Sequence, residues 1–259
     1  MNLLLLSVAH AAWAPMPGSP LFASPVADPR ASRMHVTWRP DGQIDAALGQ
    51  VVPLVQYSGP ARVQAGLLFG TWLRFEQAGP GTFNLNTFDG SFGVPVDVEL
   101  EHLAIRVAWR HTSAHIADGL DRPTITWSRE EALVQARTEL GPVQLYGGAS
   151  WLLRSTPELP RLGLQLGLES EGPWWFASAD LQLRTEDEGS PGAAAFAGLR
   201  VQRNRGPVLR LGPCAAWGPD RRGQYPNTDD PYVGLRLDLD LLPRTRVKTG
   251  AAPSAKRAS

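Results

Sequence analysis

The chain has 259 residues and no formal net charge, because 25 lysines and arginines are matched by 25 aspartates and glutamates. This balance argues against a nucleic-acid partner, which usually requires a strongly basic surface. The single cysteine, Cys214, excludes a framework of intrachain disulfides. The length is that of one large domain if the fold is all-β.

Residues 1–14 are predicted to form a secretory signal peptide. Residues 3–8 supply its apolar core, and residues 12–14 (Ala-Trp-Ala) have the small side chains of a cleavage site. No later segment contains the run of about 20 apolar residues that a transmembrane helix needs. We therefore expect an exported protein in which residues 15–32 form an N-terminal periplasmic segment.

Residues 33–241 alternate apolar and polar side chains, which is the period of a β-strand. Residues 162–168 are an example, because four leucines at alternate positions share one face and Gln165 lies on the other. The alternation predicts about twelve strands. We expect them near residues 33–39, 44–56, 62–76, 84–98, 102–112, 126–139, 142–154, 161–170, 174–184, 193–203, 207–217 and 231–241.

A soluble β-sandwich shows the same alternation, but strand length and loop pattern favour a membrane barrel. Many segments reach about 10 residues, the length of a tilted membrane-spanning strand. Short turns alternate with longer loops, as in outer-membrane barrels. Tryptophans predicted near strand ends suggest an aromatic girdle; they are Trp72, Trp109, Trp127, Trp151, Trp174, Trp175 and Trp217.

These features predict an all-β fold, a single antiparallel transmembrane β-barrel of about 12 strands in residues 33–241. The expected location is the bacterial outer membrane, with both termini in the periplasm and membrane lipids as the surrounding partner. Residues 242–259 lack periodicity and carry five basic residues among alanines, prolines and serines, which predicts a disordered basic tail.

The face opposite the apolar one is predicted to line the lumen, and it is densely charged with both signs. Mutual pairing of these charges would fill a small barrel, whereas a narrow charged pathway is the alternative. Cys214 shares this face and is expected to be a packed small residue. The charged positions are Arg74, Arg106, Arg110, Arg129, Glu131, Arg137, Glu139, Asp180, Arg184, Arg200, Arg210, Arg236, Asp238 and Asp240.

The strand around residues 105–113 carries the most specific chemical feature of the chain. Ile105, Val107 and Trp109 share their face with His111 and Ser113, so the alternation places a His-x-Ser pair on the face that would contact lipid. At a strand end, the two side chains can also serve only as hydrogen-bonding groups at the level of the lipid headgroups.

Several short motifs carry a resemblance to a known family. They are residues 27–30 (Ala-Asp-Pro-Arg), 83–86 (Phe-Asn-Leu-Asn), 111–118 (His-Thr-Ser-Ala-His-Ile-Ala-Asp), 128–130 (Ser-Arg-Glu), 146–148 (Tyr-Gly-Gly) and 223–225 (Gly-Gln-Tyr). Through them, residues 21–241 resemble the bacterial family called domain of unknown function 1207. The resemblance implies an outer-membrane barrel and no settled activity.

The His-x-Ser pair also resembles the site of outer-membrane phospholipase A and of the lipid A deacylase. In both, an Asn or Glu on the next strand orients the imidazole. Ser128 is one candidate for that position, because residues 127–129 (Trp-Ser-Arg) resemble the phospholipase motif Trp-Asn-Arg. Glu130 is the other, as in the deacylase. Both share the parity of the lipid-facing residues of their strand, so both are expected opposite His111 and Ser113.

This resemblance implies an acyl hydrolase in which Ser113 attacks an ester carbonyl, His111 accepts its proton, and Glu130 or Ser128 holds the imidazole. The reaction also needs an oxyanion hole, which Gly119 and nearby loop amides could supply. Burial of the pair inside the lumen would exclude this function. The main hypothesis from the sequence is a barrel of unsettled activity with a structural, binding or narrow transport role, and the lipid acyl hydrolase is the alternative. Whether the protein is an enzyme stays open at this point.

Neither a cofactor nor a metal ion is expected. His111, His115 and Asp118 are candidate metal ligands, but residues four apart converge on a helix and not on a strand. Asp118 and Asp121 could bind Ca²⁺ near lipid headgroups, yet they supply too few oxygen ligands.

Overall fold

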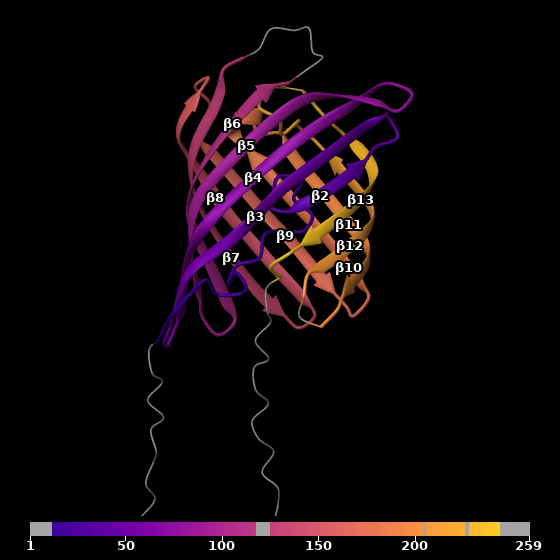
Figure 1. Ribbon diagram of the computed structural model, residues 1–259. Coiled ribbons are helices and arrows are strands. Elements are labelled where there is room, and N and C mark those ends of the chain that lie inside the picture. The colour runs from indigo at the N-terminus through magenta and orange to yellow at the C-terminus, as the bar shows by residue number, and fades with distance from the viewer. Residues whose placement is uncertain (1–11, 118–124, 205, 226–227, 244–259) are drawn as a thin grey trace, which may run out of the picture.

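The computed structural model describes residues 12–117, 125–204, 206–225 and 228–243. They form a closed antiparallel β-barrel of twelve strands, β2 to β13, with a short additional strand β1 (Figure 1). The predicted fold is therefore confirmed. Both ends of the described chain lie at the same end of the barrel (Figure 1). Among the described residues, no helix is long and apolar enough to cross a membrane.

All twelve predicted strands are present, and several are longer than expected. The elements are β1 (Ala12–Pro15), β2 (Met34–Trp38), β3 (Gln43–Ser58), β4 (Arg62–Gly79), β5 (Thr82–Glu99), β6 (Leu103–Ile116), β7 (Trp127–Leu140), β8 (Val143–Thr156), β9 (Leu162–Glu171), β10 (Trp175–Arg184), the 3₁₀ turn η1 (Thr185–Asp187), β11 (Pro191–Gln202), β12 (Val208–Trp217) and β13 (Tyr232–Asp240). From β2 to β13 each strand pairs with the next along the chain, and β2 closes the ring by pairing with β13.

Strand β1 was not expected, because three of its residues belong to the predicted signal peptide and the fourth, Pro15, directly follows it. It pairs with the part of β3 that the short strand β2 does not reach. The pairs of β1 run from Ala12 opposite Ser58 to Pro15 opposite Val55. A cleavage after Ala14 would remove three of its four residues.

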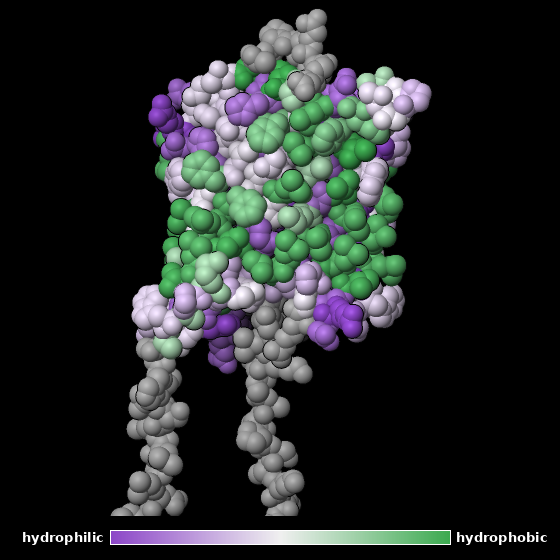
Figure 2. Space-filling model, in the orientation of Figure 1, coloured by the Kyte–Doolittle hydropathy of each residue, from purple (hydrophilic) through white to green (hydrophobic). Residues whose placement is uncertain are grey.

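On the face seen in Figure 2, apolar side chains form a belt between two more polar ends, and exposed large apolar side chains on strands β2 to β13 continue it around the barrel. The leucines of β9 illustrate it, because Leu164, Leu166 and Leu168 are 44%, 60% and 46% exposed. Gly163 and Gly167, which alternate with these leucines along the strand, are buried, so the strand presents one apolar face outward. Such a continuous apolar belt around a closed barrel is the surface that a lipid bilayer covers.

The inward face is charged, as predicted, and its charges pair with one another. The Arg106 guanidinium lies 2.7 Å from Asp97, and that of Arg137 lies 2.5 Å from Glu169. Arg110 pairs in the same way with Glu131. Cys214 is buried among apolar side chains of the interior. Buried side chains that pair with one another therefore occupy much of the lumen, with cavities remaining between them.

The N-terminal segment also fills the lumen, from about residue 20 to residue 33. Its backbone N–H groups donate to inward-facing side chains: that of Leu21 to Gln64 at 3.0 Å, that of Phe22 to Asp97 at 3.2 Å, and that of Val26 to Glu169 at 2.6 Å. Phe22 is completely buried.

Two arginines of this segment form ion pairs with two different strands of the wall. Arg30 lies 2.7 Å from Asp89 of β5, and Arg33 lies 2.7 Å from Asp238 of β13. This differs from the expected periplasmic position of residues 15–32. The physical reason is that the inward carboxylates of the strands require cationic and N–H partners, and the N-terminal segment supplies them.

Two of the tryptophans assigned to the aromatic girdle face the interior instead, so the prediction was wrong for Trp72 and Trp127. Trp72 is 7% exposed, and the Arg30 guanidinium lies 4.2 Å from the centre of its ring. Trp127 is 8% exposed and is covered by Arg129. Both have the parity of the charged positions, and a cation stacked on the ring stabilises them there.

The filled lumen predicts that the barrel does not conduct ions freely. In planar bilayers, we expect the purified protein to give no stable current steps above the baseline, because paired arginines and the N-terminal segment occupy the cross-section. A matched porin reconstituted in the same bilayers serves as the positive control. Stable, open steps from this protein would show that the lumen opens in a membrane.

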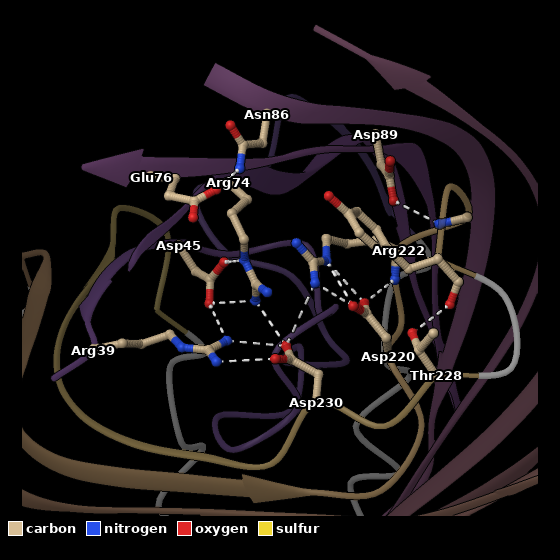
Figure 3. A network of polar contacts seen from close by, with 12 residues as sticks. Arg39, Asp45, Arg74, Glu76, Asn86, Asp89, Asp220, Arg222, Thr228 and Asp230 are labelled. Carbon is tan, nitrogen blue, oxygen red and sulfur yellow. Dashed lines mark hydrogen bonds and ion pairs between the residues drawn. The ribbon is translucent and has the colours of Figure 1, made fainter. Parts of the chain in front are cut away.

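The segment between β12 and β13 folds over the mouth opposite the termini, and an ionic network holds it (Figure 3). Asp230 accepts hydrogen bonds from Arg39 at 2.9 Å and from Arg74 at 2.8 Å. The backbone N–H of Gly223 donates to Asp89, and the Gln224 side chain donates to the carbonyl of Ala114. The segment is thus tied to four strands or strand ends of the wall, those of β2, β4, β5 and β6.

Two carboxylates in the loops at this end of the barrel, Asp230 and Glu186, have strongly lowered pKa values. Burial alone would raise the pKa of Asp230, but hydrogen bonds from Arg39 and Arg74 hold it well below its usual range. Burial likewise opposes the effect of Arg129 and Arg184 on Glu186 in η1, and the arginines lower the pKa of Glu186 to about 2. Because these carboxyl groups bind protons more weakly in the folded state, acid weakens the loop contacts.

We expect the stabilisation of the loops by these ionised carboxylates to be complete above about pH 4, the ordinary range of a carboxyl pKa. It should be lost as the pH falls toward about 2. Pepsin cleavage within residues 218–230 should therefore accelerate between pH 4 and pH 2, after correction with an unfolded substrate. In Asp230→Asn, cleavage should be fast at both pH values. Equal protection of the natural protein at pH 4 and pH 2 would contradict this account.

Candidate functional site

The candidate site lies on the outer surface of β6, toward the end of the barrel opposite the termini. His111, Ser113 and His115 occupy successive outward positions there, and the intervening Thr112 and Ala114 are buried. The predicted outward position of the His-x-Ser pair is therefore observed. The pair is not inside the lumen, so the burial that would have excluded a lipid hydrolase does not occur.

The register of β6 and β7 brings the four predicted site residues together. Glu130 lies directly opposite His111, and Ser128 lies directly opposite Ser113. The His111 Nδ1 atom is 3.9 Å from a Glu130 carboxylate oxygen, with 27% and 37% of the two side chains exposed. Of the two candidates for orienting the imidazole, Glu130 is thus the one that faces it.

Ser113 has a different partner from the one expected. Its Oγ atom lies 3.3 Å from Nε2 of His115. Within the described part of the chain, no hydrogen bond joins Ser113 to His111. Successive outward residues of a strand are separated by about 7 Å along the chain, so Ser113 stands between two imidazoles and its hydroxyl can turn to either.

Aromatic rings on β5 pack beside both histidines. The rings of Phe92 and His111 are 5.2 Å apart, and those of Phe88 and His115 are 6.1 Å apart. Between the two phenylalanines, Gly90 lies opposite Ser113. The serine therefore has a side-chain-free position on one neighbouring strand and the small Ser128 on the other, which leaves its hydroxyl open to the membrane.

His115 is the residue of this site that the sequence did not assign to hydrolysis. Its parity with His111 and Ser113 could have placed it there, because positions 111, 113 and 115 share one face of a strand. The sequence pattern suggested only a metal-binding role for His115. Strand β6 ends at Ile116, and the outward alternation continues through His115, beyond the predicted end of the strand.

Three further candidates, Asp118 and Asp121 for metal binding and Gly119 for an oxyanion hole, lie outside the described residues. Where the chain is described, no three His, Cys, Asp or Glu side chains are grouped to hold a metal ion. The site as described consists of two hydroxyl groups, Ser113 and Ser128, two imidazoles and a carboxylate. These are the groups of nucleophilic acyl transfer, in which a base accepts the proton of the attacking hydroxyl.

No protein-family model matches the chain, and no curated protein matches it. The resemblance to the domain of unknown function 1207 therefore stays a prediction. Two solved structures are similar, both of outer membrane phospholipase A from Escherichia coli. An active-site mutant of that protein matches with a TM-score of 0.56 and 12% identity, over 86% of this chain and 94% of the other.

The second structure matches with a TM-score of 0.54 and 14% identity, over 77% of this chain and 79% of the other. At this identity, the likeness concerns the fold alone. The chain thus has the closed antiparallel barrel fold of an outer-membrane protein, similar to that of the phospholipase.

Proposed function

We propose that this protein is an outer-membrane acyl hydrolase that cleaves ester bonds of membrane lipids. The observation that carries the proposal is the outward cluster of Ser113, His111 and Glu130 on adjacent strands, at the membrane-facing surface of a barrel whose lumen is filled. A site on this surface meets lipids and not soluble solutes. The fold similarity to a phospholipase agrees with the proposal.

In the proposed mechanism, Ser113 is the nucleophile and His111 is the general base. His111 is chosen over His115 because Glu130 lies beside its ring, and a carboxylate that orients an imidazole also stabilises the imidazolium formed during attack. The Ser113 hydroxyl must turn from His115 to His111, which is a rotation about one bond between staggered rotamers. Long catalytic contacts are common before substrate binds.

The reaction then follows the usual two steps of ester hydrolysis. The Ser113 oxygen forms a bond to the carbonyl carbon as its proton passes to His111, and the lipid alkoxide leaves with that proton. Water then attacks the acyl-serine with His111 again as base, which releases the fatty acid and restores the Ser113 hydroxyl. The Ser128 hydroxyl, which faces Ser113, is a polar neighbour of the reacting ester.

The alternative function is a barrel without catalysis, with a structural or binding role. The hydrogen bond between Ser113 and His115 supports it, because polar side chains at headgroup level then satisfy each other without a catalytic arrangement. The paired charges of the lumen make a general diffusion pore the weakest of the non-catalytic roles.

The test is acyl release from phospholipid and from lipid A in mixed micelles. The purified natural protein should release fatty acid, and Ser113→Ala should reduce the rate to background, because no other group in the proposed mechanism forms the covalent intermediate. Thr112→Ala, a buried neighbour on the inward face, is the matched control and should retain activity. Equal activity of the natural protein and Ser113→Ala would reject Ser113 as the nucleophile.

A further inference from the structure

A hollow beside the candidate site lies between the end of β8 and the loop that leads to β9. Its volume is about 190 Å³, and its walls include Leu153, Arg154, Glu158, Leu159 and Arg161. It is at the same end of the barrel as Ser113, because the end of β8 pairs with the part of β7 that carries Ser128 and Glu130. Arg154 lies opposite Glu130, and Thr156 lies opposite Ser128.

The two arginines of this hollow differ from those of the lumen. Inside the barrel, arginines such as Arg106 and Arg137 lie within 3 Å of a carboxylate. In the described part of the chain, no carboxylate oxygen lies within 4.0 Å of the Arg154 or Arg161 side chain. Among the residues that line the hollow, two guanidinium groups and one carboxylate, Glu158, give an excess of positive charge. Glu130 lies opposite Arg154 but outside this lining.

The surroundings place these charges at the membrane interface. Trp151 and Leu153 of β8 are each 50% exposed on the apolar belt, and Leu159 adds an apolar wall to the hollow. Arginine binds phosphate through a planar pair of N–H donors, and its charge is favourable where anionic headgroups gather. An apolar wall beside two exposed guanidinium groups matches a ligand with a phosphate and an acyl chain.

We propose that this hollow binds the phosphate of a lipid headgroup. Arg154 lies two strands from the site, in the cross-strand row of His111 and Glu130 and two residues along from the row of Ser113, which makes its separation from Ser113 about 12 Å at the usual strand spacings. A glycerolipid phosphate held there would leave the ester near Ser113, so the hollow selects phosphate-bearing lipids as substrates. This selection rests on the proposed hydrolase function, whereas the binding itself does not.

Binding can be measured without turnover in the full-length Ser113→Ala protein in a non-ionic detergent. The probe is dihexanoyl phosphatidic acid, titrated by calorimetry, with dihexanoylglycerol as the lipid that lacks phosphate. We expect the phosphatidic acid to bind at least tenfold more tightly than the diglyceride. Adding Arg161→Gln should weaken its binding at least tenfold, and Glu158→Gln should strengthen it, because each changes the charge of the hollow by one unit.

Arg203→Gln is the matched control, because Arg203 is an exposed arginine in the turn between β11 and β12, at the opposite end of the barrel. It should leave the affinity unchanged. Folding of each variant is checked by its heat-dependent mobility on gels. Unchanged binding in Arg161→Gln would overturn the proposal. If inorganic phosphate binds as tightly as the lipid, the hollow is a site for free phosphate and not for a lipid.

The outcomes separate this inference from the proposed function. Phosphate-dependent binding by Ser113→Ala, together with no hydrolysis by the natural protein, would keep the lipid site and reject the hydrolase. Hydrolysis that depends on Ser113 but not on Arg161 or on the lipid phosphate would keep the hydrolase and reject the site.

Discussion

His111→Ala is expected to lower kcat for lipid ester hydrolysis by about 10²–10⁴-fold, the usual contribution of a general base. The reason is that the Ser113 hydroxyl is a weak nucleophile unless an imidazole accepts its proton as it attacks. Glu130→Gln should give a smaller loss, because the amide can still orient the ring but does not stabilise the imidazolium. The measurement is the initial rate of acyl release at saturating substrate.

His115→Ala separates the two imidazoles. It removes the present hydrogen-bond partner of Ser113 at 3.3 Å but leaves the pair of His111 and Glu130 intact. We expect a modest change in kcat, well below that of His111→Ala. A larger loss in His115→Ala than in His111→Ala would contradict the assignment and make His115 the base.

Asp238→Asn is expected to destabilise the barrel by about 3–5 kcal/mol, the cost of breaking a buried ion pair by removing one partner. Asp238 is completely buried and accepts two hydrogen bonds from Arg33, at 3.0 and 2.7 Å. Arg210 and Arg236 also lie within 3.5 Å of its carboxylate. Replacing this carboxylate by an amide removes a negative charge that neutralises the three arginines in the lumen.

The free energy of unfolding can be followed in urea, with the folded fraction measured from the mobility of the unheated barrel on gels. Glu101→Gln is the control, because its side chain is 82% exposed in the turn between β5 and β6. Its midpoint should stay unchanged, since exposed pairs contribute little. An unchanged midpoint for Asp238→Asn would show that the N-terminal segment does not stabilise the barrel through Arg33.

The sequence predicts the wall of the barrel well, because a strand that spans a membrane must alternate side chains between lipid and lumen. The leucines at positions 162–168 and the charges near 236–240 define their faces without any knowledge of neighbouring strands. The same parity argument placed both Ser128 and Glu130 on the face of His111 and Ser113, and the register of the structure pairs Glu130 with His111. The pattern of the two strands fixes which face each residue occupies, whereas the exact pairs depend on the length of the connecting loop.

The filling of the lumen was harder to predict, since it depends on contacts between residues far apart in the sequence. Residues 20–33 have no strand periodicity, and nothing local shows that Phe22 is buried against Arg106 or that Arg33 pairs with Asp238. The partner of Ser113 was also not predictable, because the choice between His111 and His115 depends on a single side-chain rotation.

The central claim is that Ser113 is a nucleophile activated at the lipid-facing surface, and covalent labelling tests it most directly. The natural protein in detergent is incubated with a long-chain alkyl fluorophosphonate, and its intact mass and peptide map are measured. This account predicts one adduct per chain, located on Ser113, whose rate of formation falls strongly in His111→Ala. No adduct on Ser113, at reagent concentrations that label a known serine hydrolase completely, would contradict it.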